Sequence, residues 1–274
     1  MSRIAARFAE LKAANRAAFI PFVTAGDPDA ETTSALLEKL PAAGADLIEL
    51  GVPFSDPMAD GPAIQASSLR ALKAGMTLVK VLELVRKFRK THKATPLILM
   101  GYYNPIHAYG TARFAKDAAE AGVDGLITVD LPPEEDEVLR LPAAAQGLDI
   151  VRLATPTTDA MRLEAVLDGA GGFLYYVSIT GITGTKSFAE SEVHEAVVRL
   201  KAASGLPCVV GFGVKTPEQA AAVAAFADGT AVGSAIVERI AAAGEKNGRL
   251  RDTLEFCESV ARSVHGARGP AVVG

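Results

Sequence analysis

The amino-acid sequence predicts an α/β protein, a (β/α)8 TIM barrel with a short N-terminal helix and extra helices. Three observations lead to this fold. Eight short strand-like runs recur along the 274 residues, stretches with helical periodicity separate them, and no Pro/Gly/Ser linker divides the chain. Strands that alternate with helices pair in parallel through right-handed crossovers, and eight such units in about 250 residues match a closed barrel. A doubly wound open sheet is the alternative arrangement of the same units.

The expected strands are short apolar runs, and they recur about every 25 to 40 residues along the chain. Because both faces of a parallel strand are covered in a barrel, near-continuous apolar runs are the pattern to look for. In chain order the expected strands cover residues 19–23, 46–50, 97–100, 125–129, 149–153, 173–177, 208–211 and 229–232.

The expected helices are Ala-, Leu-, Glu- and Lys-rich stretches with helical periodicity. The first, over residues 1–12, is amphipathic and charged and precedes the first strand. We expect one domain over 1–265 and a flexible tail over 266–274. The remaining helical patterns cover residues 30–43, 62–74, 78–90, 111–121, 133–145, 158–168, 191–203, 217–226 and 233–243.

Composition and charge exclude several classes of protein. A net charge of -4 argues against a nucleic-acid partner, and the densest basic stretch, residues 86–93, lies at the end of a helical pattern where cations face water. No run of 18 apolar residues or signal-like segment is present, so we expect no membrane association. Cys208 and Cys257 form no CxxC pair, which is consistent with a reducing compartment and a cytoplasmic protein.

The most informative residue is Glu49, a carboxylate inside an apolar strand. Side chains alternate along a strand, so Glu49 shares a face with Leu47, while Ile48 and Leu50 share the other. If both faces are buried, the carboxylate lies in a poor solvent and its pKa rises, which suits a general acid or base. A structural carboxylate satisfied by buried donors is the alternative.

Other candidate residues also follow strand ends, where a barrel places its chemistry. Asp60 lies in the loop after Glu49, and Tyr102 and Asp130 follow the next two strands. Gly-rich turns follow the last three strands, at 181–184, 211–213 and 233–234; backbone amides in such turns suit a phosphate group. Tight turn geometry is the alternative for each glycine pair. There is no GxxxxGK[ST] loop, and no GxGxxG follows the first strand.

The sequence lacks the residues needed for two common mechanisms of carbon–carbon bond cleavage, one that uses a metal ion and one that uses a Schiff-base lysine. The four histidines are scattered without ligand spacing, so no metal site is expected, and no expected strand ends on a lysine that could form a Schiff base. Lys186 falls in a loop and Lys215 at a helix start. Acid/base chemistry by carboxylates, with a contribution from a tyrosine, on a phosphorylated small molecule remains.

The sequence resembles the α subunits of tryptophan synthase nearly from end to end. The resemblance implies retro-aldol cleavage of indole-3-glycerol phosphate to indole and glyceraldehyde 3-phosphate, a step of tryptophan biosynthesis. It also implies no cofactor in this chain and a pyridoxal-phosphate β subunit that receives indole in an α2β2 tetramer. The segments that carry it are 21–28 (PFVTAGDP), 49–62 (ELGVPFSDPMADGP), 100–105 (MGYYNP), 130–132 (DLP), 181–184 (GITG), 211–213 (GFG) and 232–237 (VGSAIV).

The resemblance also implies roles for individual residues. Glu49 is the principal acid/base, Asp60 faces the indole N–H, and Tyr175 is a secondary catalytic candidate, with a buried core tyrosine as its alternative. For Asp60 the alternative is turn chemistry at a helix start. The substrate-binding candidates are Phe22, Ile64, Met100, Tyr102, Ile127, Thr183 and Phe212, and the phosphate-binding candidates are Gly184, Gly213, Gly233 and Ser234.

Two loops are expected to close over the substrate and meet the β subunit, residues 53–58 and 181–189. We expect β binding to order both loops. Ile179 and Thr180 stand where some family members carry an Arg-containing pair, so Lys186 or Thr183 would serve loop closure instead. The expected interface residues are Pro53, Asp56, Asn104 and Pro132.

Three other functions remain open at this stage. A stand-alone indole-3-glycerol-phosphate lyase shares the chemistry and differs in its independence of a partner. A non-catalytic barrel kept as an interaction subunit is expected to lose Glu49, Asp60 or the phosphate glycines, yet all are present. A phosphosugar isomerase fits the barrel but gives no reason for Asp60 beside an aromatic pocket.

Overall fold

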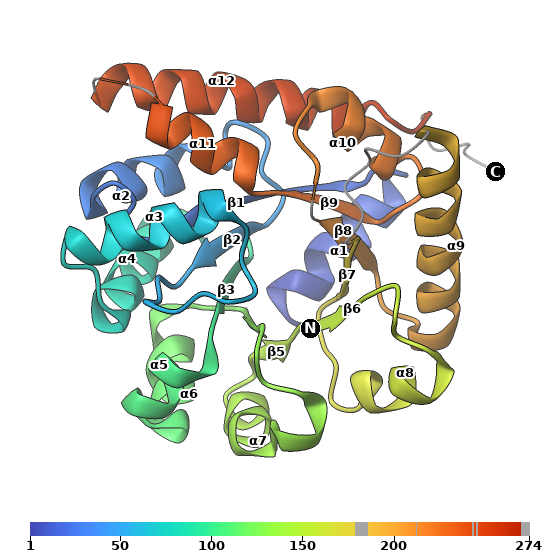
Figure 1. The fold of residues 1–274 in the computed structure, drawn as a ribbon, viewed down its shortest axis with the longest axis horizontal. Coiled ribbons are helices and arrows are strands. Elements are labelled where there is room, and N and C mark those ends of the chain that lie inside the picture. Colours follow the sequence, from blue (N-terminus) through green and yellow to red (C-terminus); the bar gives the residue numbers. More distant parts are fainter. Residues whose placement is uncertain (179–185, 212, 243, 245, 270–274) are drawn as a thin grey trace.

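The computed structural model describes residues 1–178, 186–211, 213–242, 244 and 246–269. In these residues nine parallel strands form one sheet that closes on itself. The strand order is β5-β4-β3-β2-β1-β9-β8-β7-β6, and helices surround the sheet (Figure 1). The strands are β1 (Ala18–Thr24), β2 (Ile48–Gly51), β3 (Leu97–Gly101), β4 (Gly125–Thr128), β5 (Asp149–Ile150), β6 (Arg152–Ala154), β7 (Leu174–Val177), β8 (Cys208–Gly211) and β9 (Gly229–Val232).

The barrel closes through β5 and β6, which are two parts of one strand. Only Val151 separates them, and its amide donates a hydrogen bond to the Leu126 carbonyl of β4 at 2.9 Å. β5 pairs with β4, whereas β6 pairs with β7, so this segment joins the two ends of the sheet. Counted in this way there are eight barrel strands, as predicted, and the open doubly wound sheet is excluded.

The helices confirm the alternating pattern, with local differences. The predicted helix 30–43 ends at Lys39, close to Pro41, which has no amide hydrogen to continue the ladder. The predicted helix 133–145 is a short 3-10 turn, Pro133–Glu135, followed by α7. The α-helices are α1 (Arg3–Ala13), α2 (Ala30–Lys39), α3 (Pro62–Lys73), α4 (Leu78–Thr91), α5 (Tyr103–Tyr109), α6 (Thr111–Ala121), α7 (Glu137–Ala145), α8 (Ala160–Leu167), α9 (Lys186–Ser204), α10 (Pro217–Ala224), α11 (Ser234–Ala242) and α12 (Lys246–His265).

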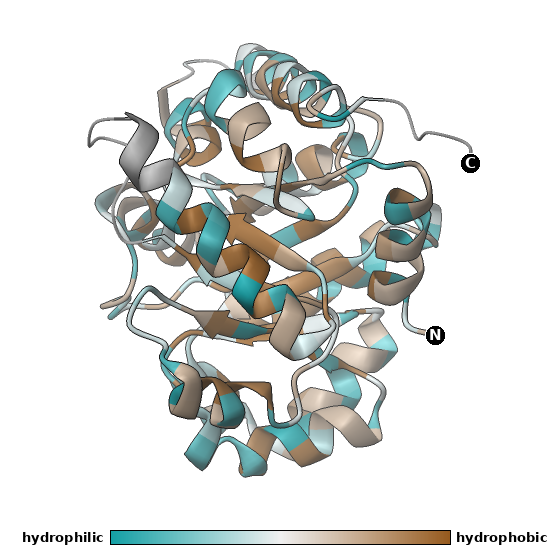
Figure 2. Cartoon of the chain, turned by 90° about the vertical axis from the view of Figure 1, so that its right-hand side faces the viewer, coloured by the Kyte–Doolittle hydropathy of each residue, from teal (hydrophilic) through white to brown (hydrophobic). Residues whose placement is uncertain are grey.

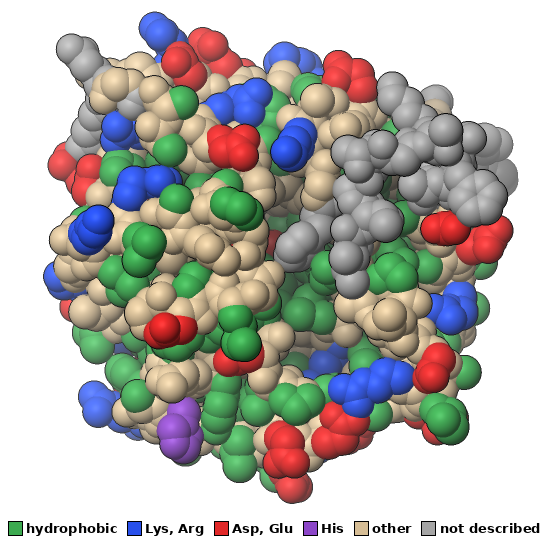
Figure 3. Space-filling model, viewed as in Figure 1, with side chains coloured by type: hydrophobic (Ala, Val, Ile, Leu, Met, Phe, Trp, Pro, Cys, Tyr) green, Lys and Arg blue, Asp and Glu red, His purple; other side chains and the backbone are tan. Residues whose placement is uncertain are grey.

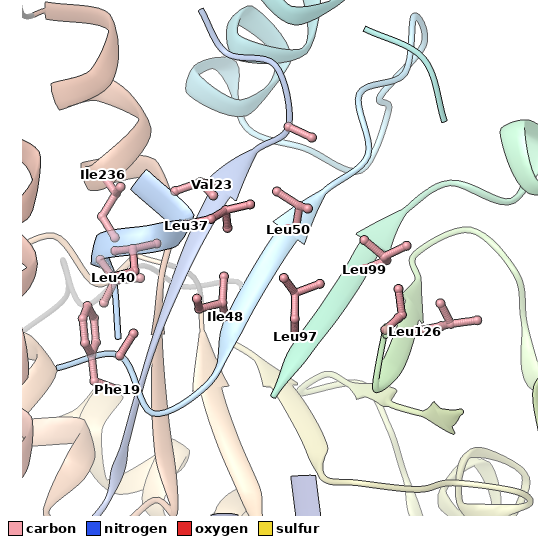
Figure 4. Close-up of a cluster of buried hydrophobic side chains, with 14 of the residues drawn as sticks. Phe19, Val23, Leu37, Leu40, Ile48, Leu50, Leu97, Leu99, Leu126 and Ile236 are labelled. Atoms are coloured by element: carbon pink, nitrogen blue, oxygen red, sulfur yellow. The ribbon is translucent and has the colours of Figure 1, made fainter. Parts of the chain in front are cut away.

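Two hydrophobic layers hold the barrel together. The outer layer packs the strands against the surrounding helices, and Figure 4 draws several of its members, among them Ile48 and Leu50 of β2 and Leu37 of α2. The helices carry hydrophilic residues on their outer faces, and the strands at the centre are mainly hydrophobic (Figure 2). Leu47 belongs to the inner layer, so the alternation expected along this strand is confirmed.

The inner layer includes the N-terminal helix. Ile4, Phe8 and Leu11 of α1 are buried among the side chains inside the barrel. The rings of Phe8 and Phe173 lie 5.6 Å apart, at the start of β7. Helix α1 therefore fills the end of the barrel at which the strands begin.

Three aspartates, two of them buried and one half-buried, link neighbouring strands at this same end. Asp46, Asp124 and Asp228 each precede a strand and accept the amide N–H of a residue in the strand before it, at 3.0, 2.7 and 2.9 Å. Each carboxylate also pairs with basic side chains. Each of these carboxylates is thus paired with a basic side chain, and its hydrogen bond to the neighbouring strand supports strand pairing.

The end of the chain contacts the barrel up to the last described residue. Arg268 donates to the carbonyls of Ala224 and Ala227, and Asn15 donates to the Gly269 carbonyl at 2.9 Å. The single domain 1–265 and the flexible tail stay predictions, and residues 270–274 lie outside the described part. No helix in the described ranges is long and apolar enough to cross a membrane.

Candidate active site

A cavity of about 340 Å³ opens at the carboxyl ends of the strands. The face seen in Figure 3 is hollowed near its centre. Residues far apart in sequence meet here because all parallel strands of a barrel end on one face. The lining residues are Phe22, Glu49, Asp60, Gly61, Pro62, Ala63, Ile64, Met100, Tyr175, Gly213, Val214, Lys215, Ala231, Gly233, Ser234 and Glu238.

Glu49 lies at the floor of this cavity with almost no contact with solvent. It is 1% exposed, and its Oε1 has no hydrogen-bond partner among the described residues. Burial raises the pKa of the Glu49 carboxyl from an ordinary 4.5 to about 8. A carboxylate satisfied by buried donors does not fit an unpartnered oxygen, so Glu49 has the environment of a proton donor at neutral pH.

Tyr175 projects from β7 into the same interior. It is 4% exposed, and burial together with the charge of Glu49 raises its pKa well above the ordinary value. A Cβ added to Gly211 of β8 would come within 2.0 Å of the Tyr175 hydroxyl oxygen. The missing side chain at Gly211 therefore makes the room that the hydroxyl occupies, and Tyr175 is both buried and part of the cavity wall.

Asp60 lies on the opposite side, in the loop between β2 and α3. Burial raises the pKa of its carboxyl, and a hydrogen bond with the Tyr102 hydroxyl opposes that shift. The Tyr102 hydroxyl also accepts the Ala59 amide at 2.9 Å, and its ring lies 5.2 Å from that of Phe54. Gly61 is the N-cap of α3, and Asp60 directly precedes it in a turn in which its amide donates to the Pro57 carbonyl at 3.1 Å, so the turn-chemistry alternative for Asp60 stays open.

The apolar candidates divide between the cavity and its surroundings. Phe22, Ile64 and Met100 line the cavity, and Tyr102 lines a small adjoining recess together with Asp60. Ile127 is buried inside the barrel but is not a lining residue. The predicted Thr183, Phe212 and Gly184 lie outside the described residues, as do Ile179, Thr180 and the side chain of Lys186.

The described phosphate candidates come together at one end of the cavity. Gly213 has a φ of +80°, a conformation that favours glycine, and it lies beside Gly233 and Ser234 in the lining. Helix α11 begins at Ser234, so the amides of Ser234 and Ala235 have no acceptor within the helix. This end of the cavity offers amide donors and the positive end of a helix to an anion.

Two charged lining residues were not predicted as site residues. Lys215 follows β8, and Glu238 lies one turn into α11. The sequence places Lys215 at a helix start and offers no Schiff-base nucleophile; the residue lies just before α10, which begins at Pro217. Its position after a strand end is the signal that could have identified it, whereas Glu238 reaches the cavity only through the packing of its helix.

The expected interface residues differ in exposure. Asp56, Asn104 and Pro132 are exposed, and Asn104 belongs to α5, a helix without predicted bounds. Pro53 is buried and offers no free surface in this conformation. In the described ranges no group of three or more His, Cys, Asp or Glu side chains could hold a metal ion.

A second cavity of about 340 Å³ lies behind β4 and β6, against α7 and α8. Its buried Arg152 pairs with Asp136 at 2.6 Å. Neither Glu49 nor Asp60 lines it, so the acid/base chemistry belongs to the first cavity.

Comparison with known proteins gives consistent matches. The family model "Tryptophan synthase alpha chain" matches residues 8–265. A tryptophan synthase subunit alpha from Legionella pneumophila str. Paris is 44% identical, with a TM-score of 0.90 and coverage of 96% of this chain and 98% of that one. A tryptophan synthase alpha chain from L. pneumophila subsp. pneumophila is 43% identical, with a TM-score of 0.88 and coverage of 96% and 97%. A Mycobacterium tuberculosis tryptophan synthase structure in an aminoacrylate-bound form is 34% identical, with a TM-score of 0.86 and coverage of 96% and 100%.

Proposed function

The chain belongs to the tryptophan synthase alpha chain family, whose lyase reaction cleaves indole-3-glycerol phosphate in tryptophan biosynthesis, and from this premise we propose which residues carry the reaction. Membership does not favour a stand-alone lyase, a phosphosugar isomerase or a non-catalytic subunit. The observation that carries the assignment of roles is the buried Glu49, whose pKa of about 8 keeps it protonated at neutral pH.

Glu49 acts first as an acid and then as a base. It donates its proton to C3 of the indole ring, and the ring nitrogen takes the positive charge. The Glu49 carboxylate then accepts the proton of the side-chain hydroxyl as the bond between C3 and the glycerol carbon breaks. The bond electrons return to the ring, which leaves indole, glyceraldehyde 3-phosphate and a protonated Glu49. Because the substrate is its own electron sink, the chain needs no cofactor for this step.

Asp60 stabilises the charge that develops on the indole nitrogen. Its carboxylate accepts the ring N–H, and this interaction strengthens in the intermediate because the nitrogen is then cationic. The Tyr102 hydrogen bond fixes the direction of the Asp60 carboxyl. Phe22, Ile64 and Met100 supply the apolar walls that suit an indole ring.

Tyr175 assists Glu49 as a hydrogen-bond donor. Its raised pKa keeps the hydroxyl protonated at all working pH values. A neutral donor beside Glu49 stabilises the carboxylate that forms after proton transfer. The phosphate of the substrate binds at Gly213, Gly233 and Ser234, at the other end of the cavity, with Gly184 as the further expected contact.

The partner is a tryptophan synthase β subunit that carries pyridoxal phosphate, in an α2β2 tetramer in the cytoplasm. An exposed surface beside the cavity supports this proposal. Asp56, Asn104 and Pro132 are exposed there, and Met58 is 85% exposed in the loop that leads to Asp60. Met is one of the residue types enriched in protein–protein interfaces, so Met58 suits a contact with the partner. Docking there orders the loop that holds Asp60.

The test is indole release from indole-3-glycerol phosphate by the purified chain, with and without a β subunit. We expect activity that rises when β is added and that is lost in Glu49→Gln with β present. The same β preparation without this chain is the matched control. Activity that ignores β contradicts the partner proposal, and full activity of Glu49→Gln contradicts the role of Glu49.

A further inference from the structure

Helix α11 and the loop after β8 place two opposite charges at the phosphate end of the cavity. Lys215 and Glu238 both line it, together with Gly213, Gly233 and Ser234. Lys215 is the one cationic side chain in the described lining. The two residues come from neighbouring barrel units, since β8 pairs with β9.

Within the described part of the chain the Lys215 amine is available to a ligand. The side chain is exposed, and no described residue forms an ion pair or hydrogen bond with it. Its backbone is fixed instead, because the Lys215 amide donates to Gln219 Oε1 at 2.8 Å and Thr216 caps α10. An unpaired ammonium on an anchored backbone, beside amides that already suit an anion, has the chemistry of a phosphate contact.

The other charges in the cavity wall explain why a phosphate ligand needs the Lys215 ammonium. A phosphate monoester carries between one and two negative charges at pH 7. Amide donors and the helix end carry only partial charges, while Glu238 contributes a full negative charge beside them and Asp60 adds another elsewhere in the same cavity. Without Lys215 the phosphate would enter a region whose full charges are all repulsive.

We propose that Lys215 binds the phosphate of the substrate directly, and that Glu238 opposes it, so that this pair of residues sets the affinity of the cavity for phosphorylated ligands. The assignment rests on the proposed function, in which this cavity holds indole-3-glycerol phosphate. The two residues have effects of opposite sign. Removal of the Lys215 charge weakens phosphate binding, whereas removal of the Glu238 charge strengthens it.

The size of both effects follows from exposure to solvent. A unit charge about 4 Å away in a watery environment changes the affinity for a monovalent anion by about fivefold; the energy doubles for a fully divalent phosphate, to about thirtyfold, and salt screening lowers both values. We therefore expect about a fivefold to tenfold loss in Lys215→Gln and a gain of a few fold in Glu238→Gln. Both effects should shrink at high salt, because 1 M salt shortens the Debye length to about 3 Å.

The experiment measures binding of inorganic phosphate and, separately, of indole to the full chain by calorimetry at low and high salt. The variants are Lys215→Gln, Glu238→Gln, the charge-preserving Lys215→Arg, and Lys116→Gln as a control for net charge on α6, far from the lining residues. We expect opposite shifts in phosphate affinity for the first two variants, little change for the other two, and unchanged indole binding in all four.

The Michaelis constant for indole-3-glycerol phosphate gives the second readout, and it should rise in Lys215→Gln while kcat changes little. Equal phosphate binding by Lys215→Gln and Lys116→Gln would overturn the proposal, as would an equal loss of indole affinity, which indicates a damaged cavity. These binding measurements need no turnover. A wild-type chain that binds phosphate through Lys215 but releases no indole would contradict the proposed function and leave this assignment standing.

Discussion

Glu49 is an ionisable group at a position where its own charge is unfavourable. The strand that carries it faces the barrel interior on one side and helices on the other, and no described donor satisfies Oε1. A core residue selected for stability alone would be apolar here. The desolvation cost of the Glu49 carboxylate agrees with the role proposed for it, because the same burial makes the neutral acid available at neutral pH.

The free energy of unfolding should therefore depend on pH through Glu49. Its folded pKa, about 8, lies above the ordinary 4.5, so the folded state binds more protons between these values and loses stability as pH rises across this window. The loss is about 1.4 kcal/mol per pH unit. We expect urea denaturation to show that, between pH 5 and pH 8, the free energy of unfolding falls more in wild type than in Glu49→Gln. The change with pH is the readout, because a buried amide adds a constant offset.

Glu10→Gln is the matched control, since Glu10 is exposed on α1 and should leave the pH dependence unchanged. A gap between wild type and Glu49→Gln that stays constant from pH 5 to pH 8 would show that the pKa of Glu49 is ordinary.

Gly211 is a second residue whose identity the active site requires. An added methyl group would lie 2.0 Å from the Tyr175 hydroxyl oxygen and 2.4 Å from the ring carbon that bears it, so Tyr175 must move. We expect Gly211→Ala to lose about 1–3 kcal/mol of stability through overpacking and to lose most of its activity. Thermal denaturation and indole release measure the two effects. Gly244→Ala, which meets nothing within 4 Å, should change neither; wild-type activity in Gly211→Ala would place Tyr175 outside the reaction.

Helix α3 holds Asp60 in place through contacts made further along its length. Thr24 of β1 and Ser67 share a hydrogen bond of 2.6 Å, and Arg70 donates to both oxygens of Asp27 at 2.7 and 2.8 Å. Both contacts tie the helix to the end of β1. The first turn of α3 follows Asp60 closely, so the helix transmits this anchoring to the Asp60 carboxylate.

Loss of the Arg70 contact should disturb stability and activity together. Asp27 is 1% exposed, and Arg70→Gln leaves its carboxylate buried with a weaker partner. We expect a loss of about 3 kcal/mol in the free energy of unfolding, measured in urea, and a lower kcat because α3 shifts. Arg113→Gln serves as the control, because its side chain is 72% exposed and its ion pair contributes little. A kcat equal to that of wild type in Arg70→Gln would show that Asp60 is positioned by its own loop alone.

Most elements were predictable because their signals are local. The eight strands were recognisable as short apolar runs, and each lies within two residues of its predicted bounds, apart from the break at Val151. Helices α5 and α12 had no predicted bounds; α5 contains Pro105, which reads as a breaker although the first helical turn tolerates it. The inward side chain of Glu49 also followed from local alternation. The position of Glu238 in the cavity wall did not, because it depends on how α11 packs around the barrel, whereas Lys215 follows a strand end and carries a local signal.

At the scale of the whole molecule, closure depends on contacts that no local pattern contains. The first strand pairs with the last, Ala18 with Gly229, and β5 and β6 join the remaining edges. An open sheet and a barrel share the same order of elements, so only these long-range pairings separate them. The count of eight alternating units predicted the barrel over the open sheet, and the resemblance to a known family supplied the reaction; the strand pairing confirms the barrel and family membership confirms the reaction. The individual catalytic roles remain predictions for the experiments above.

Helix α1 closes one end of the barrel, and this determines where the substrate can enter and where the products can leave. Phe8 and its neighbours fill the end at which the strands begin, so the cavity opens to solvent only at the carboxyl ends of the strands among the described residues. Indole therefore cannot leave through the amino-terminal end of the barrel. It must leave across the same rim by which its parent compound arrived. A recipient docked on that rim therefore stands in the path of every departing indole, and the glyceraldehyde 3-phosphate made in the same turnover must share that exit.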